Sequence, residues 1–369
     1  MESFYFCCFW KTNFTFFQLI AQSINSYLHR QLRNGLKRIA GILSFFIVGI
    51  YHSTAQDVHW SQFNAIPIFQ NPGNAGHFNG DYRFVGNYRD QWRSVTVPFS
   101  TFALSADMKL PKQQAIGTGI QFFHDLSGDG KLRTVEVNAN ASYLIKLTED
   151  SSHTIRPGIH LGMNHRQVNW DAFYFDNQFN GSQYDPTLAS NENYQSDRKT
   201  NLTVGLGAIY EYQFQPRKKV IAGIGFYNLN RSNQGFYTQK IQRDIRTNFF
   251  INGIYKLDID WDLVPGLSFS VQGKYREFMV GSSVKYTLVN RVGNYRALYA
   301  GLHYRNRDAA ILSVGMDYQS WFVGFSYDLN FSKLVPASRT VGGFELAVRY
   351  ILFHFKPSKS IHRVCPDYI

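Results

Sequence analysis

NLTVGLGAIYEYQF, residues 201–214, alternates between apolar and polar side chains almost without interruption. One side of the alternation carries Leu202, Val204, Leu206, Ala208, Tyr210, Tyr212 and Phe214, and the other carries Asn201, Thr203, Gly205, Gly207, Glu211 and Gln213. Ile209 is the one large apolar residue in the polar row. Because successive side chains of a β-strand point to opposite faces, this stretch predicts a strand with one apolar and one polar surface.

The length of the alternating runs favours a membrane β-barrel over a soluble β-sandwich. The runs reach about 10–14 residues, which suits a strand that crosses a bilayer at a tilt, whereas strands of soluble sheets have about 5–6 residues. We therefore predict an all-β fold, a transmembrane antiparallel outer-membrane barrel. About 14 strands are expected, an even number as in bacterial barrels, over 81–94, 99–110, 114–124, 132–146, 153–165, 201–213, 218–229, 246–257, 265–274, 277–287, 295–305, 309–318, 320–330 and 340–354.

The connections between the predicted strands sort by length. Those at one end are short, at 111–113, 149–151 and 215–217, whereas the two long ones, about 166–200 and 230–245, both fall at the other end. Bacterial barrels have short periplasmic turns and long extracellular loops. The sorting therefore predicts that the long loops lie outside the cell and that both chain ends lie in the periplasm.

The amino-acid composition agrees with a membrane barrel and argues against a nucleic-acid-binding protein. Phe and Tyr number 32 and 23, which suits the aromatic girdles of a membrane barrel; the alternative is an aromatic-rich soluble β protein. The net charge of +12 comes without a basic helix or an RNA-binding signature, so we expect no nucleic-acid partner. A basic lumen or an anionic lipid surface accounts for the charge. Cys7, Cys8 and Cys365 have no metal-site spacing.

The N-terminus reads as a secretory signal. Basic residues between 30 and 38 precede an apolar run at 39–50, and Ser53-Thr54-Ala55 supplies small residues at the cleavage positions, so we predict cleavage after Ala55. The alternative, an anchor helix, is disfavoured because the run is too short to span about 30 Å. Residues 1–29 are expected to be an extension from a misassigned start. The predicted segments are a signal peptide at 1–55, a periplasmic N-terminal segment at 56–80, a barrel at 81–355 and a periplasmic C-terminal tail at 356–369.

Short motifs follow one another from residue 56 to the C-terminus. Their main residues are Asn71, Pro72, Gly76, Arg89, Gln91, Trp92, Asp107, Arg305, Asp308, Tyr327, Asp328, Asn330, Cys365 and Pro366. In order and spacing these motifs resemble the PorP/SprF family of outer-membrane proteins, which belongs to the type IX secretion and gliding machinery of Bacteroidetes. Gly73 stands where the family usually has Ala, and the stretch 166–245 resembles the family least.

The resemblance implies a non-enzymatic outer-membrane component of type IX secretion, without a cofactor. Some members of the family accompany periplasmic ring components, and others are paired with large surface adhesins that they help to deliver or hold. The implied partners are therefore outer-membrane lipid, a secreted surface protein bound through its C-terminal domain, and a periplasmic ring or lipoprotein component. The alternative function is a solute porin or transporter.

One motif has the pattern of a calcium loop. Asp125, Ser127, Asp129, Gly130 and Glu136 match the spacing of oxygen ligands around a sharp glycine turn. Such loops normally join two helices, whereas Glu136 lies here in a predicted strand. A hairpin tip built from Asp and Gly accounts for the same residues, so both interpretations stay open.

Two polar rows are expected to line the lumen. They are Thr134, Glu136, Asn138, Asn140, Ser142 and Lys146, and Ser268, Ser270, Gln272, Lys274 and Arg276. They form either a conduction pathway or the wall of a plugged lumen in which opposite charges neutralise one another. The apolar residues Phe63, Ile66, Ile68 and Phe69 either plug the periplasmic mouth or bind a neighbour. No nucleophile with a partnered histidine is recognisable, because the histidines, such as His160, His165, His303 and His354, are scattered.

Overall fold

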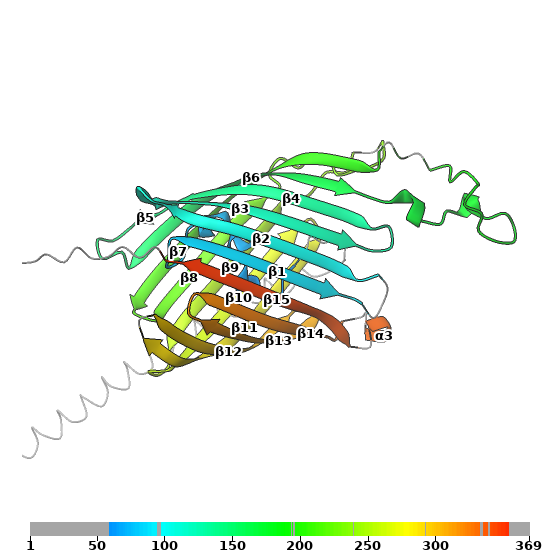
Figure 1. Cartoon of the computed structure of the whole chain (residues 1–369). Coiled ribbons are helices and arrows are strands. Elements are labelled where there is room, and N and C mark those ends of the chain that lie inside the picture. Colours follow the sequence, from blue (N-terminus) through cyan, green and yellow to red (C-terminus); the bar gives the residue numbers. More distant parts are fainter. Residues whose placement is uncertain are drawn as a thin grey trace, which may run out of the picture. The chain divides into compact units, whose positions relative to one another are not determined.

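The chain forms a closed antiparallel β-barrel (Figure 1). The computed structural model describes residues 59–353, except 94–96, 193, 195, 239, 292, 333–334 and 339. All of them belong to one compact unit, Thr54–Ile369. The predicted signal at 1–55, the tail at 356–369 and the motif residues Cys365 and Pro366 lie outside the described residues.

Fourteen strands close the barrel, as the alternation predicts. The short strand β5 continues β4, because both pair with β6, and β1 closes the ring by pairing with β2 and β15. The bounds are β1 Tyr82–Gln91, β2 Phe99–Leu110, β3 Gln113–Ser127, β4 Leu132–Tyr143, β5 Ile145–Lys146, β6 His153–Gln167, β7 Arg198–Gln215, β8 Lys218–Tyr227, β9 Arg246–Lys256, β10 Trp261–Gln272, β11 Tyr275–Arg291, β12 Asn294–Arg305, β13 Ala309–Tyr318, β14 Trp321–Asn330 and β15 Val341–Leu352.

The predicted start of the strand at 265–274 is wrong. β10 already begins at Trp261 and includes Pro265. Proline cannot donate to a neighbouring strand. The ladder between β9 and β10 accordingly skips from Leu263 to Gly266, and the strand continues on the other side of the gap.

The two ends of the barrel differ. One end, the short-turn end, carries the brief connections such as 111–112 and 216–217. The opposite, long-loop end carries the loop 168–197 between β6 and β7 and the loop 228–245 between β8 and β9. The first of these extends well beyond the strands (Figure 1).

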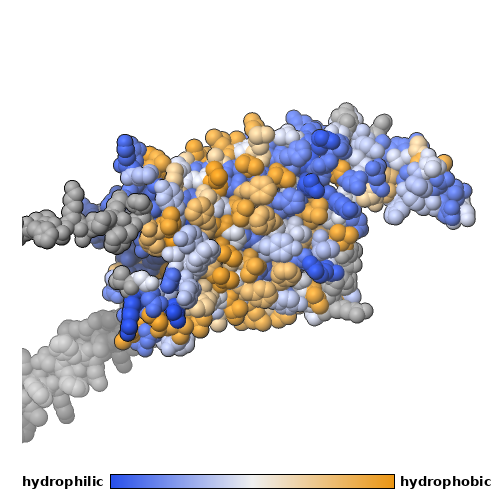
Figure 2. Space-filling view, viewed as in Figure 1, coloured by the Kyte–Doolittle hydropathy of each residue, from blue (hydrophilic) through white to orange (hydrophobic). Residues whose placement is uncertain are grey.

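The outer surface suits a lipid environment. Along β7, Leu202, Leu206 and Phe214 are exposed, whereas Thr203 is only 2% exposed and faces the lumen. Hydrophobic residues form much of the visible wall, with hydrophilic residues gathered towards the ends (Figure 2). Among the described residues, no helix is both long and apolar enough to span a membrane.

Residues 59–80, here called the plug, occupy the lumen. They contain three single turns of helix, η1 Phe63–Ala65, α2 Pro67–Gln70 and η2 Pro72–Asn74. Ile66 and Ile68 are almost completely buried. The plug also explains Ile209, the exception in the polar row of β7, which is buried with its backbone nitrogen beside Gly73. Of the two predicted roles for the apolar residues, the structure shows a lumenal one.

The lipid-facing row of β7 gives a test of the fold. Leu206→Arg places a charge halfway along the strand and should lower the free energy of unfolding by about 2–4 kcal/mol, because arginine at the bilayer midplane is costly. Thr200→Arg lies on the same face near the strand end and should change it by about 0–1 kcal/mol. Urea unfolding in lipid, followed by tryptophan fluorescence, measures both; equal losses in the two variants would contradict the assigned lipid face.

Candidate functional site

The last helical turn of the plug, η2, lies against one wall of the lumen. The turn η2 contacts β4, β6 and β7. Two glycines of these strands permit the approach, because a Cβ atom at Gly158 would come within 2.5 Å of Gly73 N and one at Gly207 within 2.8 Å of Pro72 Cδ. The Asn71 side chain accepts from Gly73 N at 2.8 Å and donates to the Ala208 carbonyl at 3.2 Å. Asn71 therefore both caps the turn and joins it to β7.

A second anchor fixes the end of the plug to the first strands. Gly76 has a φ of 67°, which favours glycine, and its backbone nitrogen donates to Asp107 Oδ2 at 2.7 Å. Arg83 holds the same carboxylate through two nitrogens, at 2.8 and 2.9 Å, and also donates to the Asn74 carbonyl at 2.9 Å. Such a bidentate contact fixes both position and orientation. The predicted motif residues Gly76 and Asp107 thus meet directly.

The start of the plug is held by a buried network of opposite charges. Arg89 contacts Asp328 at 2.8 Å and Glu345 at 3.0 Å, and all three side chains are at most 3% exposed. Arg305 contacts the same oxygen of Asp328 at 3.0 Å. Ser61 of the plug joins the network: its backbone nitrogen donates to Glu345 at 2.7 Å and its hydroxyl to Asp328 at 2.6 Å.

This arrangement, here called the Arg89 network, consists of Ser61, Arg89, Arg305, Asp308, Asp328 and Glu345. Four of these, Arg89, Arg305, Asp308 and Asp328, come from three separate sequence motifs that the fold brings together. Gln91 adds an acceptor for Arg89 at 3.1 Å.

Other motif residues lie apart from the network. Trp92 packs on Phe99, with ring centroids 4.8 Å apart, beyond the end of β1. Tyr327 belongs to the opposite row of β14 from the buried Asp328. Asn330 is buried at the end of β14.

Sequence reasoning did not single out Ser61, Arg83 and Glu345 as members of the site. The last two share one feature. Both are charged residues whose strand neighbours on the opposite face are apolar, as Phe344 and Leu346 are beside Glu345. A charge in the lumenal row of a strand was therefore the available signal. The partners lie on other strands, Asp107 24 residues from Arg83 and Arg89 256 residues from Glu345, so the pairing itself had no local signal.

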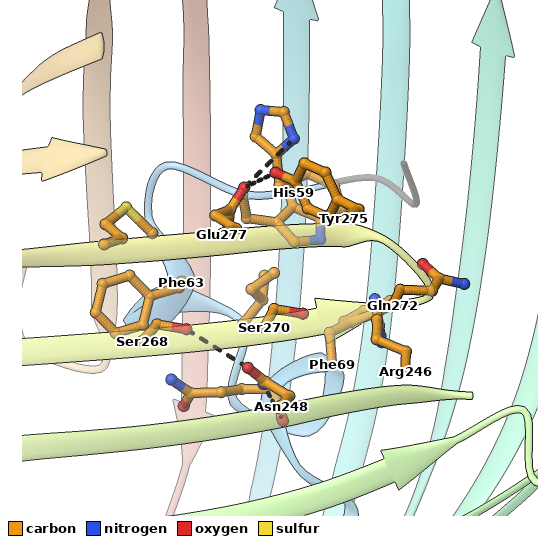
Figure 3. A pocket seen from close by; sticks show the side chains of 14 residues that line it. His59, Phe63, Phe69, Arg246, Asn248, Ser268, Ser270, Gln272, Tyr275 and Glu277 are labelled. Atoms are coloured by element: carbon orange, nitrogen blue, oxygen red, sulfur yellow. Dashed lines mark hydrogen bonds and ion pairs between the residues drawn. The ribbon is translucent and has the colours of Figure 1, made fainter. Parts of the chain in front are cut away.

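A small cavity of ≈ 60 Å³ adjoins the start of the plug (Figure 3). Tyr275 donates to Glu277 at 2.8 Å, and His59 Nδ1 lies 3.7 Å from the same carboxylate. On the neighbouring strands β10 and β9 of the same wall, Ser268 donates to Asn248 at 3.5 Å. A space of this size suits a few water molecules.

One lumenal row differs from its prediction. Ser268, Ser270 and Gln272 line this cavity, but Lys274 lies in the two-residue turn after β10. The alternation restarts after the turn, so that Tyr275 and Glu277 of β11 face the lumen and Arg276 falls in the opposite row. The prediction that Lys274 and Arg276 line the lumen is therefore wrong, because the row was extended through a turn.

The residues of the calcium motif have other partners. Asp125 accepts from Thr101 at 2.7 Å and from Ser127. Glu136, on β4, accepts from Arg243 at 2.8 Å and from Asn164 at 2.5 Å, and Asp129 lies between β3 and β4. In the described part of the chain, no group of three or more His, Cys, Asp or Glu residues is placed to hold a metal ion. Calcium binding stays a prediction.

The Arg89 network gives a test of how the plug is held. Arg89→Met should lower the free energy of unfolding by about 3–5 kcal/mol, because it leaves Asp328 and Glu345 with less compensation in a buried site. The matched control is Arg133→Met, which removes an exposed arginine from β4. Chemical denaturation of the purified barrel measures both; a loss as small as that of the control would contradict a structural role of the network.

Two histidines of the plug make its docking sensitive to pH. Burial lowers the pKa of His59 well below 6.5, as do Arg305 and Arg89, while Asp328 opposes them. Burial also lowers the pKa of His77 below 6.5, against the opposing effect of Glu211 3.1 Å away. Both are neutral when docked. Their contribution to docking is therefore complete above pH 6.5 and is lost as the pH falls below that value.

Acidification should accordingly loosen the plug. A nitroxide label on Asn64→Cys, in a background with Cys7→Ser, Cys8→Ser and Cys365→Ser, is expected to gain mobility between pH 7.5 and 5, as measured by electron paramagnetic resonance. The same label with His59→Gln and His77→Gln should respond less. Equal pH responses in both proteins would show that other groups control the plug.

Comparison with known proteins gives one family match. A sequence profile described as "Type IX secretion system membrane protein PorP/SprF" matches residues 52–350. No curated protein matches the chain significantly.

Among solved structures, the chain is similar to a Pseudomonas aeruginosa FadL homologue, with 12% identity, 78% of this chain and 93% of that chain covered, and a TM-score of 0.45. It is also similar to the Pseudomonas putida toluene transporter TodX, with 8% identity, 80% and 95% covered, and a TM-score of 0.46. At these scores the similarities carry no argument about function.

Proposed function

Because the chain belongs to the PorP/SprF family of type IX secretion system membrane proteins, we propose that this outer-membrane barrel is a non-enzymatic component that binds partners at its two ends. A secreted surface protein, held through its C-terminal domain, binds at the long-loop end. A periplasmic ring or lipoprotein component binds at the short-turn end. The predicted removal of residues 1–55 and a periplasmic tail at 356–369 form part of this proposal.

The occupied lumen is the observation that carries the proposal. The plug is attached to β1, β2, β7, β14 and β15 by hydrogen bonds or ion pairs. Because the plug occupies the lumen, the two ends of the barrel are the surfaces where a partner can bind. The same filling argues against the alternative, a solute porin or transporter.

The long-loop end presents an ordered surface rich in aromatic side chains. Trp170 stacks on Tyr194 at 4.5 Å and meets Tyr237 edge-on at 5.6 Å, so that the loops 168–197 and 228–245 pack on each other. Tyr194 and Tyr237 also form a β-bridge. Tyr174 remains 78% exposed. Exposed aromatic side chains on an ordered loop are typical of protein-binding surfaces.

The charge of the longer loop indicates the kind of surface it prefers. Between 168 and 197 the chain has no Lys, Arg or His, although the whole protein is basic. The carboxylates of this loop are Asp171, Asp176, Asp185, Glu192 and Asp197. An acidic loop is repelled by anionic lipid and attracted to a cationic protein segment. The proposed surface protein therefore presents Lys and Arg to this loop.

Pull-down from native membranes tests the proposal. The variant with Asp171→Asn, Asp176→Asn, Asp185→Asn and Glu192→Gln should recover about tenfold less surface protein than the native barrel, because rim charges set the rate of encounter. The matched control, Asp258→Asn with Asp260→Asn, removes carboxylates from a turn at the other end and should recover native amounts.

Gene deletion separates the two candidate functions. Loss of surface-protein export or attachment is expected on deletion. If export and attachment continue unchanged while the purified native barrel conducts ions in planar bilayers, the porin alternative replaces the proposal.

A further inference from the structure

A second cavity, of ≈ 380 Å³, lies beside the plug. Its wall comes from strands β8 to β15 and from β1, whereas η2 is packed against β4, β6 and β7. Small lumenal residues create the space, since Ser283, Ser313 and Gly315 line it on β11 and β13. A cavity of this size falls within the range of small-molecule sites.

The charged side chains that line this cavity are all basic. They are Arg83, Lys219, Lys285 and Arg349, and the histidines His77 and His303 line it as well. No aspartate or glutamate occurs among the described residues of the lining. Lys219 and Arg349 lie near the short-turn ends of their strands, and Lys285 is paired with Asp262, the second residue of β10 at that same end. The charge is therefore concentrated towards the short-turn end.

Two of these cations are incompletely neutralised. Lys285 Nζ is 3.9 Å from Asp262, whose carboxylate already accepts from Arg217 at 3.0 Å. Arg349 has a contact of 3.4 Å to Asp317, which also accepts from the Tyr299 hydroxyl at 2.6 Å.

Tyr299 connects these two cations. Lys285 Nζ is 5.7 Å from the Tyr299 ring centroid, and the hydroxyl of the same tyrosine reaches the carboxylate that Arg349 contacts. The other two charged side chains have closer ion-pair partners: Arg83 is held by Asp107, and Lys219 lies 3.0 Å from Glu211.

The inner part of the cavity adds polar groups without protein partners. His303 is only 8% exposed, and its Nδ1 has no hydrogen-bond partner among the described residues. Asn64 Oδ1 of the plug and Asn252 Oδ1 of β9 are also buried without a hydrogen-bond partner among the described residues. Buried polar atoms are normally satisfied, so their convergence on one cavity points to a polar ligand.

We propose that this cavity binds an anionic ligand bearing carboxylate or phosphate groups, which enters from the short-turn end. Lys285 and Arg349 hold its charge. Asn64 Oδ1 accepts from a hydroxyl or N–H group in its inner part, and His303 Nδ1 hydrogen-bonds beside it. A free small anion and the acidic side chains of a protein segment share this chemistry. The site does not depend on the secretion role proposed above, because binding is measured on the purified protein alone.

Isothermal titration of the purified barrel at low ionic strength tests the site. Citrate is the small-anion probe and a tetra-aspartate peptide is the protein-segment probe. Saturable binding is expected, and Lys285→Gln or Arg349→Gln should weaken it about tenfold, because each removes one charge-assisted contact. Lys112→Gln, in an exposed turn at the same end of the barrel, should bind as the native protein does.

The outcomes separate clearly. Tighter binding of the peptide identifies a protein segment as the source of the anion, and tighter binding of citrate identifies a free solute; both support the site. Absence of saturable binding of either probe to the native barrel overturns it. Binding that both cavity variants retain at native affinity, with native heat-modifiable migration on gels, overturns it as well.

Discussion

Arg89 lies between two buried carboxylates, and the plug, the seam of the barrel and the polar lumen all depend on this contact. Removing charges from water costs several kcal/mol for each ion, which is offset only when geometry and hydrogen bonds are nearly complete. Asp328 and Glu345 are completed by Ser61, a residue of the plug. The barrel wall alone therefore lacks a donor that the N-terminal segment supplies.

The same logic extends to the rest of the lumen. A barrel of this many strands encloses more space than its own side chains fill, whereas an eight-stranded barrel fills its interior. Here the plug occupies part of that space, and its turns rest on glycines of β6 and β7. The uncovered side keeps a basic cavity. The lumen thus contains a packed plug with a basic cavity beside it.

The sequence predicted the fold well because the signal for a membrane strand is local. Alternation has a period of two residues, and strand ends are marked by turn residues, so 201–214 identified β7 and similar runs identified the others. The errors arose where a proline inside a strand, or a short turn between two strands, was not recognised as such. Pro265 suggested a strand start where it only interrupts a ladder, and the row through Lys274 and Arg276 continued across a turn.

The site was harder to predict because its contacts are not local. Arg89 and Glu345 are 256 residues apart in the chain, and Ser61 and Glu345 are 284 apart. The motifs identified Arg89, Arg305 and Asp328 one by one, but only closure of the ring brings them together. The apolar residues of the plug were recognised, while two possible roles stayed open, because amphipathic turns pack equally well on a lumen or on a neighbour.

The position of the Arg89 network has a consequence for the order of assembly. It joins the plug, which precedes the first strand, to β14 and β15, which are synthesised last, and β15 pairs with β1 at the closing seam. Contacts between such distant parts of a chain form late in folding, since the intervening loop must first be closed. Closure of the ring and docking of the plug are therefore expected to occur together, and a chain without its N-terminal segment would close around two buried carboxylates that lack the hydrogen bonds from Ser61.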